Sequence, residues 1–280
     1  MLSGYITVEG SKIYYEEYGK GVPLLFLEGL GYSTWMWYKQ VDELAEGYRC
    51  ILIDNRGVGK SERLSGPYTI DFYARDAIAV LEELGVRSTF LVGVSMGGFI
   101  AQSIASKMKE RVQGMVLIST SCGGRISLPM PTETWKELNR NIEGEDYAGR
   151  IERVMKLALT DSFPYMNAEE FQRIIKLRLI EPQDREQWLF QAMSSVNFDA
   201  CDSDSKLEAP ALIMAGMKDK VMPWLNSLYL FKVIPNASLV LFSQQNHLLF
   251  IEEYKKVNEK IKSFVSDVTK GSFFPRIELL

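Results

Sequence analysis

The sequence predicts an α/β fold, in which a mostly parallel central sheet carries helices on both faces and an inserted helical cap. Two observations support this prediction. Short apolar runs alternate with helical patterns over about the first 120 residues and again near the C-terminus, as in strand–helix units that build a parallel sheet. Between these two regions, from residue 123 to residue 206, only helical patterns occur.

The predicted strands are of two kinds. Two runs near the N-terminus, YITVEG and KIYYEEYG, alternate in polarity like strands with one exposed face. The later runs are continuously apolar, as expected for strands covered on both faces, and they are VPLLFLE, RCILIDN, TFLVGV, GMVLIST, APALIMAG and SLVLF. The segments between them carry apolar residues at helical spacing, and these are TWMWYKQVDELAE, TIDFYARDAIAVLEELG, GGFIAQSIASKMKE, PWLNSLYLFKVI and a final helix over about residues 248–265.

The segment 123–206 contains four helical patterns, TETWKELNRNIE, DYAGRIERVMKLALT, NAEEFQRIIKLRLI and REQWLFQAMSSV. We expect this segment to pack over the edge of the sheet as a cap, with residues 1–122 and 207–280 forming the core. Six aromatic residues of the cap could line an apolar pocket, and they are Trp135, Phe163, Tyr165, Phe171, Trp188 and Phe190. Among them we take Trp135 and Trp188 as the candidate pocket residues.

The composition is that of a soluble globular protein, with 46% hydrophobic and 24% charged residues in a chain of 280. The net charge is −4 and no basic residues cluster, so nucleic acid is not an expected partner. The N-terminus lacks the features of a signal peptide, and no apolar stretch is long enough to span a bilayer. We therefore expect a cytoplasmic protein, either a monomer or a homo-oligomer, that acts on a small molecule.

The three cysteines, Cys50, Cys122 and Cys201, are odd in number and far apart in the sequence. Such spacing is not typical of a disulfide framework or of a metal site. The sequence therefore predicts buried thiols in a reducing compartment.

A candidate nucleophile follows the strand TFLVG, where Gly93-Val94-Ser95-Met96-Gly97 has the form G-x-S-x-G and leads into a helical pattern. In this setting the serine occupies a sharp, strained turn that projects its hydroxyl into a cleft. Side chains at Gly93 and Gly97 would collide with the neighbouring strand or helix. The start of the helix directs backbone N–H groups towards the site.

A serine nucleophile needs a base, and the chain contains one histidine, His247, between the strand SLVLF and the last helix. Asp219, at the end of the strand APALIMAG, is the candidate that orients the imidazole ring. Asp202 and Asp204 compete by proximity but precede that strand. The resulting order, serine then aspartate then histidine, predicts a Ser95–Asp219–His247 triad.

These motifs together resemble the α/β-hydrolase superfamily, in particular its small cap-bearing serine esterases and carbon–carbon hydrolases of the meta-cleavage type. The resemblance covers nearly the whole chain and rests on EGLG, DNRGVGKS, GVSMGG, the G-x-x-D-x-x-x-P pattern of GMKDKVMP, and NH before the last helix. It implies an oxyanion hole made by the backbone N–H groups of Leu30 and Met96. Relatives often have glycine before the catalytic histidine, where this chain has Asn246, a residue that tolerates unusual backbone angles.

A second departure from the family pattern is Glu28, which stands where small cap-bearing relatives usually carry histidine, just before Gly29. A charged carboxylate facing an oxyanion would raise the barrier to reaction. The carboxyl group can avoid this by protonation on burial, by pairing with a cation or by bonding backbone N–H groups. Arg56 is the nearest cation by topology, so we hypothesise that a Glu28–Arg56 pair, or backbone bonding by Glu28, shapes the oxyanion loop.

The resemblance implies hydrolysis of a small carboxylic ester or lactone through an acyl-enzyme, with no metal or organic cofactor. Two alternatives stay open at this point. Relatives with the same triad cleave carbon–carbon bonds in vinylogous diketones, and other hydrolase folds bind ligands with little turnover. Glu28 favours the binding alternative, whereas the complete triad favours an enzyme.

Overall fold

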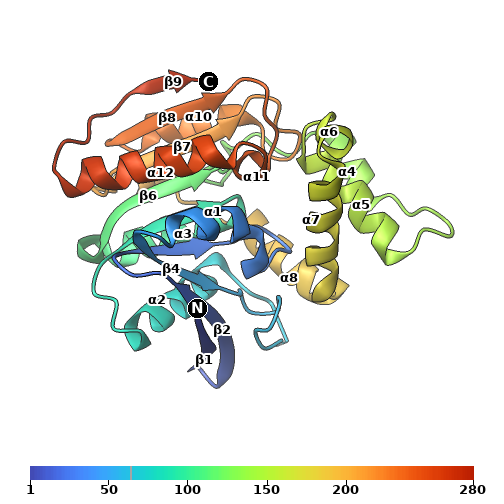
Figure 1. The fold of residues 1–280 in the computed structure, drawn as a ribbon, viewed down its shortest axis with the longest axis horizontal. Helices are drawn as coiled ribbons and strands as arrows, with labels where there is room; N and C mark the ends of the chain where they lie inside the picture. The colour runs from blue at the N-terminus through green and yellow to red at the C-terminus, as the bar shows by residue number, and fades with distance from the viewer. Residues whose placement is uncertain (64) are drawn as a thin grey trace.

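The computed structural model describes residues 1–63 and 65–280, and a single sheet runs through it (Figure 1). The strand order is β1-β2-β4-β3-β5-β6-β7-β8-β9. The hairpin β1–β2 and the pair β2–β4 are antiparallel, and every pair from β4 onward is parallel. The strands are β1 (Leu2–Val8), β2 (Ser11–Tyr18), β3 (Val22–Leu27), β4 (Tyr48–Ile53), β5 (Thr89–Val94), β6 (Val112–Ile118), β7 (Ala211–Gly216), β8 (Ala237–Phe242) and β9 (Ile277–Leu279). This is the predicted mostly parallel sheet.

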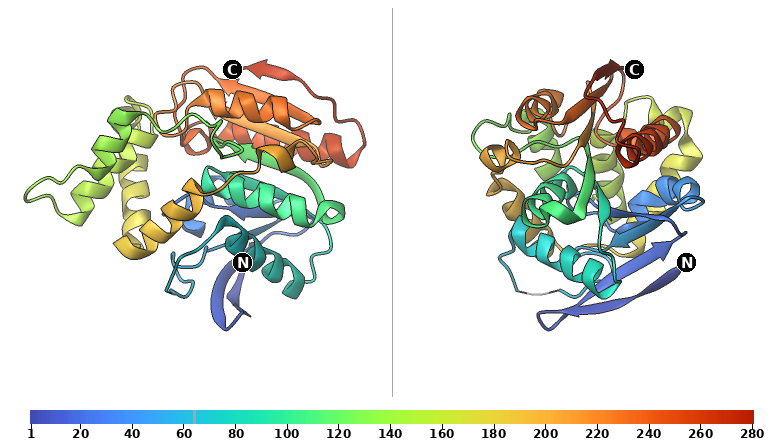
Figure 2. Two further views of the ribbon diagram at one scale, coloured as in Figure 1. Left: turned by 180° about the vertical axis from the view of Figure 1, so that it is seen from behind. Right: turned by 90° about the vertical axis from the view of Figure 1, so that its left-hand side faces the viewer.

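Helices cover both faces of the sheet (Figure 2). Those that belong to the strand–helix units are α1 (Tyr38–Leu44), α2 (Ile70–Glu83), α3 (Met96–Lys107), α10 (Trp224–Val233) and α12 (Tyr254–Thr269), with the short turns η1 (Thr34–Trp37), η2 (Lys109–Arg111) and α11 (Leu249–Glu252). The start of α2 is fixed by Thr69, whose side chain accepts a hydrogen bond from the N–H of Phe72.

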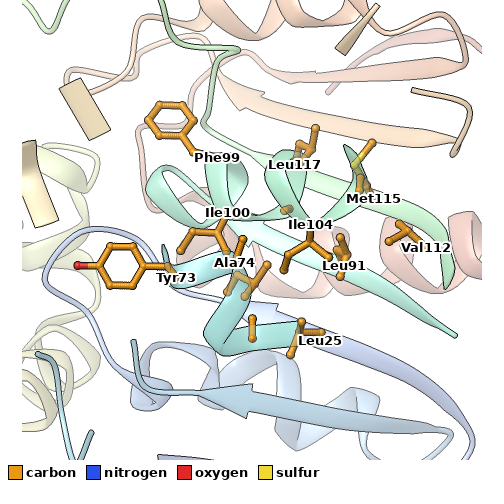
Figure 3. Packing of buried hydrophobic residues seen from close by; sticks show 14 of the residues in the cluster. Leu25, Tyr73, Ala74, Leu91, Phe99, Ile100, Ile104, Val112, Met115 and Leu117 are labelled. Atoms are coloured by element: carbon orange, nitrogen blue, oxygen red, sulfur yellow. The ribbon is translucent and has the colours of Figure 1, made fainter. Parts of the chain in front are cut away.

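Alternate residues of β3 point to opposite faces of the sheet and join two separate cores. Leu25 and Leu27 belong to a cluster with buried residues of α2, α3 and α10, part of which is shown in Figure 3. Leu24 and Phe26 belong to a second cluster with residues of α1 and α12. This two-sided burial explains the continuously apolar strands and fixes the sheet that carries the site.

Between β6 and β7 the described residues form helices and connecting loops, with an isolated β-bridge between Gly123 and Asp199, and most of the helices lie together at one end of the sheet (Figures 1 and 2). They are α4 (Thr132–Asn139), α5 (Tyr147–Ala158), α6 (Phe163–Met166), α7 (Ala168–Ile180), α8 (Arg185–Val196) and the short α9 (Cys201–Asp204). We call α4–α8 the cap helices. The division of the chain into a core and an inserted domain, with boundaries after residues 122 and 206, stays a prediction.

The prediction of three free thiols was wrong for two of the cysteines. Cys122 and Cys201 form a disulfide across 79 residues, and Cys50 is a buried free thiol. Cys122 lies just after β6, where the chain leaves the sheet, and Cys201 begins α9, where the chain returns. The sequence spacing did not reveal that the point where the chain leaves the sheet lies beside the point where it returns. Because a disulfide joins these points, the expectation of a reducing compartment loses its support.

Among the described residues, no helix is both long and apolar enough to cross a membrane.

Candidate active site

Ser95 lies in a sharp turn between β5 and α3, with backbone angles of φ 54° and ψ −119°. Positive φ is strained for a residue with a Cβ atom and is found mostly at functional turns. A Cβ atom at Gly93 would lie 2.3 Å from the carbonyl oxygen of Gly97, and one at Gly97 would lie 1.9 Å from that of Leu27. Both predicted collisions are therefore present, and the turn requires glycine on each side of Ser95.

His247 and Asp219 are in direct contact, with 2.8 Å between Nδ1 of the imidazole ring and Oδ2 of the carboxylate. The other carboxylate oxygen of Asp219 accepts hydrogen bonds of 2.8 Å from the N–H groups of Val221 and Met222. These bonds fix the carboxylate and leave one oxygen for the ring. The competing Asp202 is exposed on α9.

Asn246 ties the histidine loop to its surroundings through four hydrogen bonds. Its side-chain oxygen accepts from the N–H groups of His247, at 2.8 Å, and of Lys220, at 2.9 Å. Its amide nitrogen donates to the carbonyl oxygens of Leu157 and Leu159 at the end of α5. Asn246 is not among the described residues with positive φ, so these bonds, and not an unusual backbone angle, account for asparagine at this position.

The turn after β3 passes beside the candidate nucleophile. The N–H of Tyr32 donates to the carbonyl of Gly29 at 3.2 Å, and Gly31 has φ +76°, as in a turn that needs glycine at its third position. A Cβ atom at Gly29 would lie 3.5 Å from the Cβ of Ser95. Leu30, in the middle of the turn, lines a cavity together with Ser95.

Met96, directly after Ser95, begins α3, so its N–H has no acceptor within the helix. It also lines this cavity. The two residues expected to supply the oxyanion hole, Leu30 and Met96, are thus brought to the same cavity as the serine hydroxyl.

Glu28 is fully buried, and its Oε1 accepts a hydrogen bond of 2.6 Å from the N–H of Asn55 in the loop after β4. Burial, and to a lesser extent the charge of the nearby Asp54, raise the pKa of Glu28 well above its ordinary value. Burial therefore favours the neutral form of this carboxyl group. The hydrogen bond from Asn55 bears out the backbone-bonding alternative for Glu28, and its effect on the oxyanion loop stays a prediction.

The predicted pair between Glu28 and Arg56 was wrong. Arg56 instead forms a bidentate pair with Asp76 of α2, with Nη2–Oδ1 and Nε–Oδ2 distances of 2.6 and 3.0 Å. The guanidinium also lies 4.7 Å from the centre of the Phe72 ring. Asp76 supplies the carboxylate that a buried guanidinium needs, and Glu28 bonds the N–H of Asn55 instead.

A cavity of about 690 Å³ lies between the loops at the carboxyl ends of the parallel strands and the cap helices. Ser95 and His247 line it from the sheet side, and both candidate pocket residues, Trp135 and Trp188, line it from the cap side. The other four aromatic residues named from the sequence do not line it: Phe163 and Phe171 are buried among apolar side chains, Tyr165 is exposed, and Phe190 packs on Tyr68.

One permanent charge lines the cavity within the described part of the chain, and it belongs to Arg178 of α7. Its guanidinium lies 4.2 Å from the centre of the Tyr32 ring. The Nη1 atom is buried without a hydrogen-bond partner among the described residues. An anionic or carbonyl-bearing ligand group could satisfy it.

Sequence reasoning missed the glutamines of α8. The buried residues of this helix are Gln187, Gln191 and Ser194, so the face that packs on the molecule is polar. Gln191 accepts a hydrogen bond of 3.0 Å from the N–H of Gly31, in the turn beside Ser95. The available signal was the helical spacing of these polar residues, which differs from the apolar stripe of an ordinary packed helix.

Comparison with known proteins agrees with this geometry. The family model described as "alpha/beta hydrolase fold" matches residues 22–254. A 2-hydroxy-6-oxononadienedioate/2-hydroxy-6-oxononatrienedioate hydrolase of Paraburkholderia phymatum is 31% identical over 281 residues, which cover 94% of this chain and 95% of the relative.

Two solved structures are also similar. Est816, described as an N-acyl homoserine lactone degrading enzyme, has a TM-score of 0.79 at 29% identity and covers 93% of this chain and 100% of its own. A thermophilic esterase from Thermogutta terrifontis has a TM-score of 0.79 at 26% identity and covers 96% of this chain and 99% of its own.

Proposed function

The chain belongs to the α/β-hydrolase fold family, and from this premise we propose that it is a serine hydrolase that cleaves a small carboxylic ester or lactone. The observation that carries the proposal is the 2.8 Å contact between Asp219 and His247, whose imidazole lines the same cavity as Ser95. Ser95, His247 and Asp219 act as nucleophile, general base and orienting acid.

The reaction proceeds through an acyl-enzyme. His247 takes the proton of the Ser95 hydroxyl as the oxygen attacks the substrate carbonyl, and Asp219 holds the ring and stabilises its protonated form. The N–H groups of Leu30 and Met96 donate to the oxyanion of the tetrahedral intermediate. As the intermediate collapses, His247 protonates the leaving alcohol. His247 then deprotonates a water molecule, which attacks the acyl-enzyme. The second tetrahedral intermediate collapses, His247 returns the proton to the Ser95 oxygen, and the acid is released.

The raised pKa of Glu28 weakens the main objection to this mechanism. A negative charge near the oxyanion would oppose its formation, and more so in a dry cavity. Burial favours the neutral form of the carboxyl group, which exerts no such effect.

The cavity supports a substrate with an apolar acyl or aryl group. Its wall consists mostly of apolar side chains, and Trp135 and Trp188 form part of it on the cap side. The esterase and the lactone-degrading enzyme among the similar structures support the same substrate class.

A second candidate function is hydrolysis of a carbon–carbon bond in an acidic dienone with the same triad. Arg178 favours it, because a guanidinium with an unpartnered nitrogen in the cavity wall suits a substrate carboxylate. The P. phymatum relative is named for a dioate substrate of this kind. Comparing kcat/KM for a ring-cleavage dienone and for a p-nitrophenyl ester on the same preparation separates the two functions.

The proposal is tested with a fluorophosphonate probe and p-nitrophenyl esters on wild type, Ser95→Ala and Ser127→Ala. Ser127 also lines the cavity and serves as the matched control. We expect the probe to label wild type and Ser127→Ala, and Ser95→Ala to lose labelling and to lose turnover by a factor on the order of 10³ or more. Labelling of Ser95→Ala, or a folded wild type that neither reacts nor turns over, would contradict the proposal.

A further inference from the structure

The polar face of α8 lies against the turn that carries the Leu30 N–H, and we propose that Gln191 is a positioning residue for the oxyanion hole. Gln191 touches no reacting atom. It acts through Gly31, so that a cap helix sets the geometry of a turn on the sheet. This inference rests on the proposed function and adds to it a residue outside the triad and outside the family motifs.

The side-chain oxygen of Gln191 joins the turn to the segment before α8. Oε1 accepts a hydrogen bond of 3.0 Å from the N–H of Gly31 and another of 3.0 Å from Nε2 of Gln183. Nε2 of Gln183 also donates to the carbonyl of Gly57 at 3.3 Å, in the loop after β4. Gln191 is fully buried, so water does not compete for these bonds.

The Gly31 N–H belongs to the peptide unit at the centre of the turn from Gly29 to Tyr32. The two common turn types differ mainly in the orientation of this central unit, and the positive φ of Gly31 records the orientation seen here. An acceptor placed on its N–H fixes that orientation. The central unit and the Leu30 N–H are joined at the α-carbon of Leu30, so a shift of the central unit also moves that α-carbon and the donor attached to it. Holding the Gly31 N–H against Gln191 therefore helps to hold the Leu30 donor in position.

The cap surrounds this turn on its outer side. A Cβ atom at Gly31 would lie 3.2 Å from Nη2 of Arg178, 3.2 Å from Cδ1 of Trp188 and 3.3 Å from Oε1 of Gln183. On the core side, Glu28 is held by the N–H of Asn55. The turn is thus fixed from the core at its start and from the cap at its centre. The docking of the cap helices and the assembly of the oxyanion hole are coupled by this arrangement.

The test compares Gln191→Met with Gln187→Met. Gln187 is one turn earlier on the same buried face, but its Oε1 accepts from the Tyr68 hydroxyl at 3.0 Å and not from the turn. For each protein, kcat and KM are measured with a p-nitrophenyl ester, together with inhibition by a trifluoromethyl ketone. This inhibitor adds to a serine nucleophile and forms an oxyanion, so its affinity reports the oxyanion hole directly.

We expect Gln191→Met to lower kcat by about 10- to 100-fold, to change KM by less than about threefold, and to weaken the inhibitor by the same factor as kcat/KM. Gln187→Met should leave both kcat/KM and the affinity for the inhibitor within about threefold of their wild-type values. Gln183→Met, at a half-buried position, should act in the same direction as Gln191→Met by a smaller factor, and it provides the test should Gln191→Met not fold.

The two possible failures are distinct. A wild type that neither hydrolyses the ester nor binds the ketone contradicts the proposed function itself. If wild type hydrolyses the ester and binds the ketone, two results overturn the inference about Gln191. In the first, Gln191→Met and Gln187→Met change kcat and inhibitor affinity by the same factors. In the second, Gln191→Met changes KM alone.

Discussion

The buried carboxyl group of Glu28 accepts a 2.6 Å hydrogen bond from the N–H of Asn55, and this contact joins the turn beside Ser95 to the loop after β4. The bond needs an acceptor oxygen but no negative charge. The neutral form, which burial favours, meets that need and would not oppose the oxyanion of the proposed reaction.

Glu28→Gln is therefore expected to keep most of the stability and turnover near pH 7, because glutamine has the same shape and retains the acceptor. Glu28→Leu should lower the free energy of unfolding by about 1–3 kcal/mol and reduce kcat/KM about tenfold, since the Asn55 N–H loses its partner and the turn is released. Chemical denaturation and ester hydrolysis measure the two effects. A tenfold or greater rise in kcat for Glu28→Gln would show instead that Glu28 is charged in the native protein.

Asp219→Asn tests the acid that contacts His247. Asparagine carries no charge to stabilise the protonated ring, and its NH₂ group can donate to Nδ1 and hold the ring in the wrong tautomer, so we expect kcat to fall by a factor on the order of 10³–10⁴. Asp202→Asn, at the exposed competing position, should leave kcat within about twofold. Equal losses in the two variants would remove Asp219 from the triad. The comparison requires matched circular dichroism spectra, because Asp219 also accepts from Val221 and Met222.

Asp204 should make the stability of the protein depend on pH. It is fully buried, neither carboxyl oxygen has a hydrogen-bond partner among the described residues, and burial raises its pKa to about 8. The unfolded chain releases this proton near pH 4, whereas the folded protein retains it to about pH 8, so stability falls as the pH rises between these values.

Asp204→Asn keeps the shape of the protonated acid and removes this titration. Between about pH 5 and pH 8, the melting temperature of wild type should fall by at least a few degrees more than that of the variant. Glu28 and Asp54 also have raised pKa values, so the difference between the two proteins is the relevant quantity. Parallel curves for wild type and Asp204→Asn would exclude a protonated Asp204.

The disulfide between Cys122 and Cys201 closes a loop that contains all the cap helices. Cys201→Ser should lower the free energy of unfolding by about 2–4 kcal/mol, because the unfolded chain regains the freedom of that loop. A reducing agent should lower the stability of wild type by a similar amount and leave the variant unchanged. Alkylation of the denatured, unreduced wild type should modify Cys50 alone; modification of all three cysteines would show that the bond is absent from the purified protein.

Much of the candidate site could be predicted because its residues follow local rules. Gly93 and Gly97 flank Ser95 at the spacing that a tight strand–helix turn requires, and the apolar strand before it locates the turn on the sheet. His247 was identified because the chain has one histidine. Asp219 follows the strand next to that of His247, and the carboxyl ends of parallel strands meet at one edge.

The contacts that could not be predicted join segments whose approach depends on side-chain packing. Arg56 pairs with Asp76 of α2 and not with the predicted Glu28, and this pairing depends on how α2 packs on the sheet. The disulfide depends on where the chain leaves and re-enters the sheet, across 79 residues. No local pattern encodes such distances.

The sequence by itself determined the parallel sheet, the strained serine turn and the order of the candidate triad, because periodicity, glycine spacing and the ends of strands are local properties. The tertiary structure decided how the turn beside Ser95 is held. Gln191 reaches Gly31 from 160 residues away, and the pKa of Glu28 is raised because the folded protein excludes water from it. Desolvation and the pairing of distant polar groups arise only when the cap helices and the sheet are packed together.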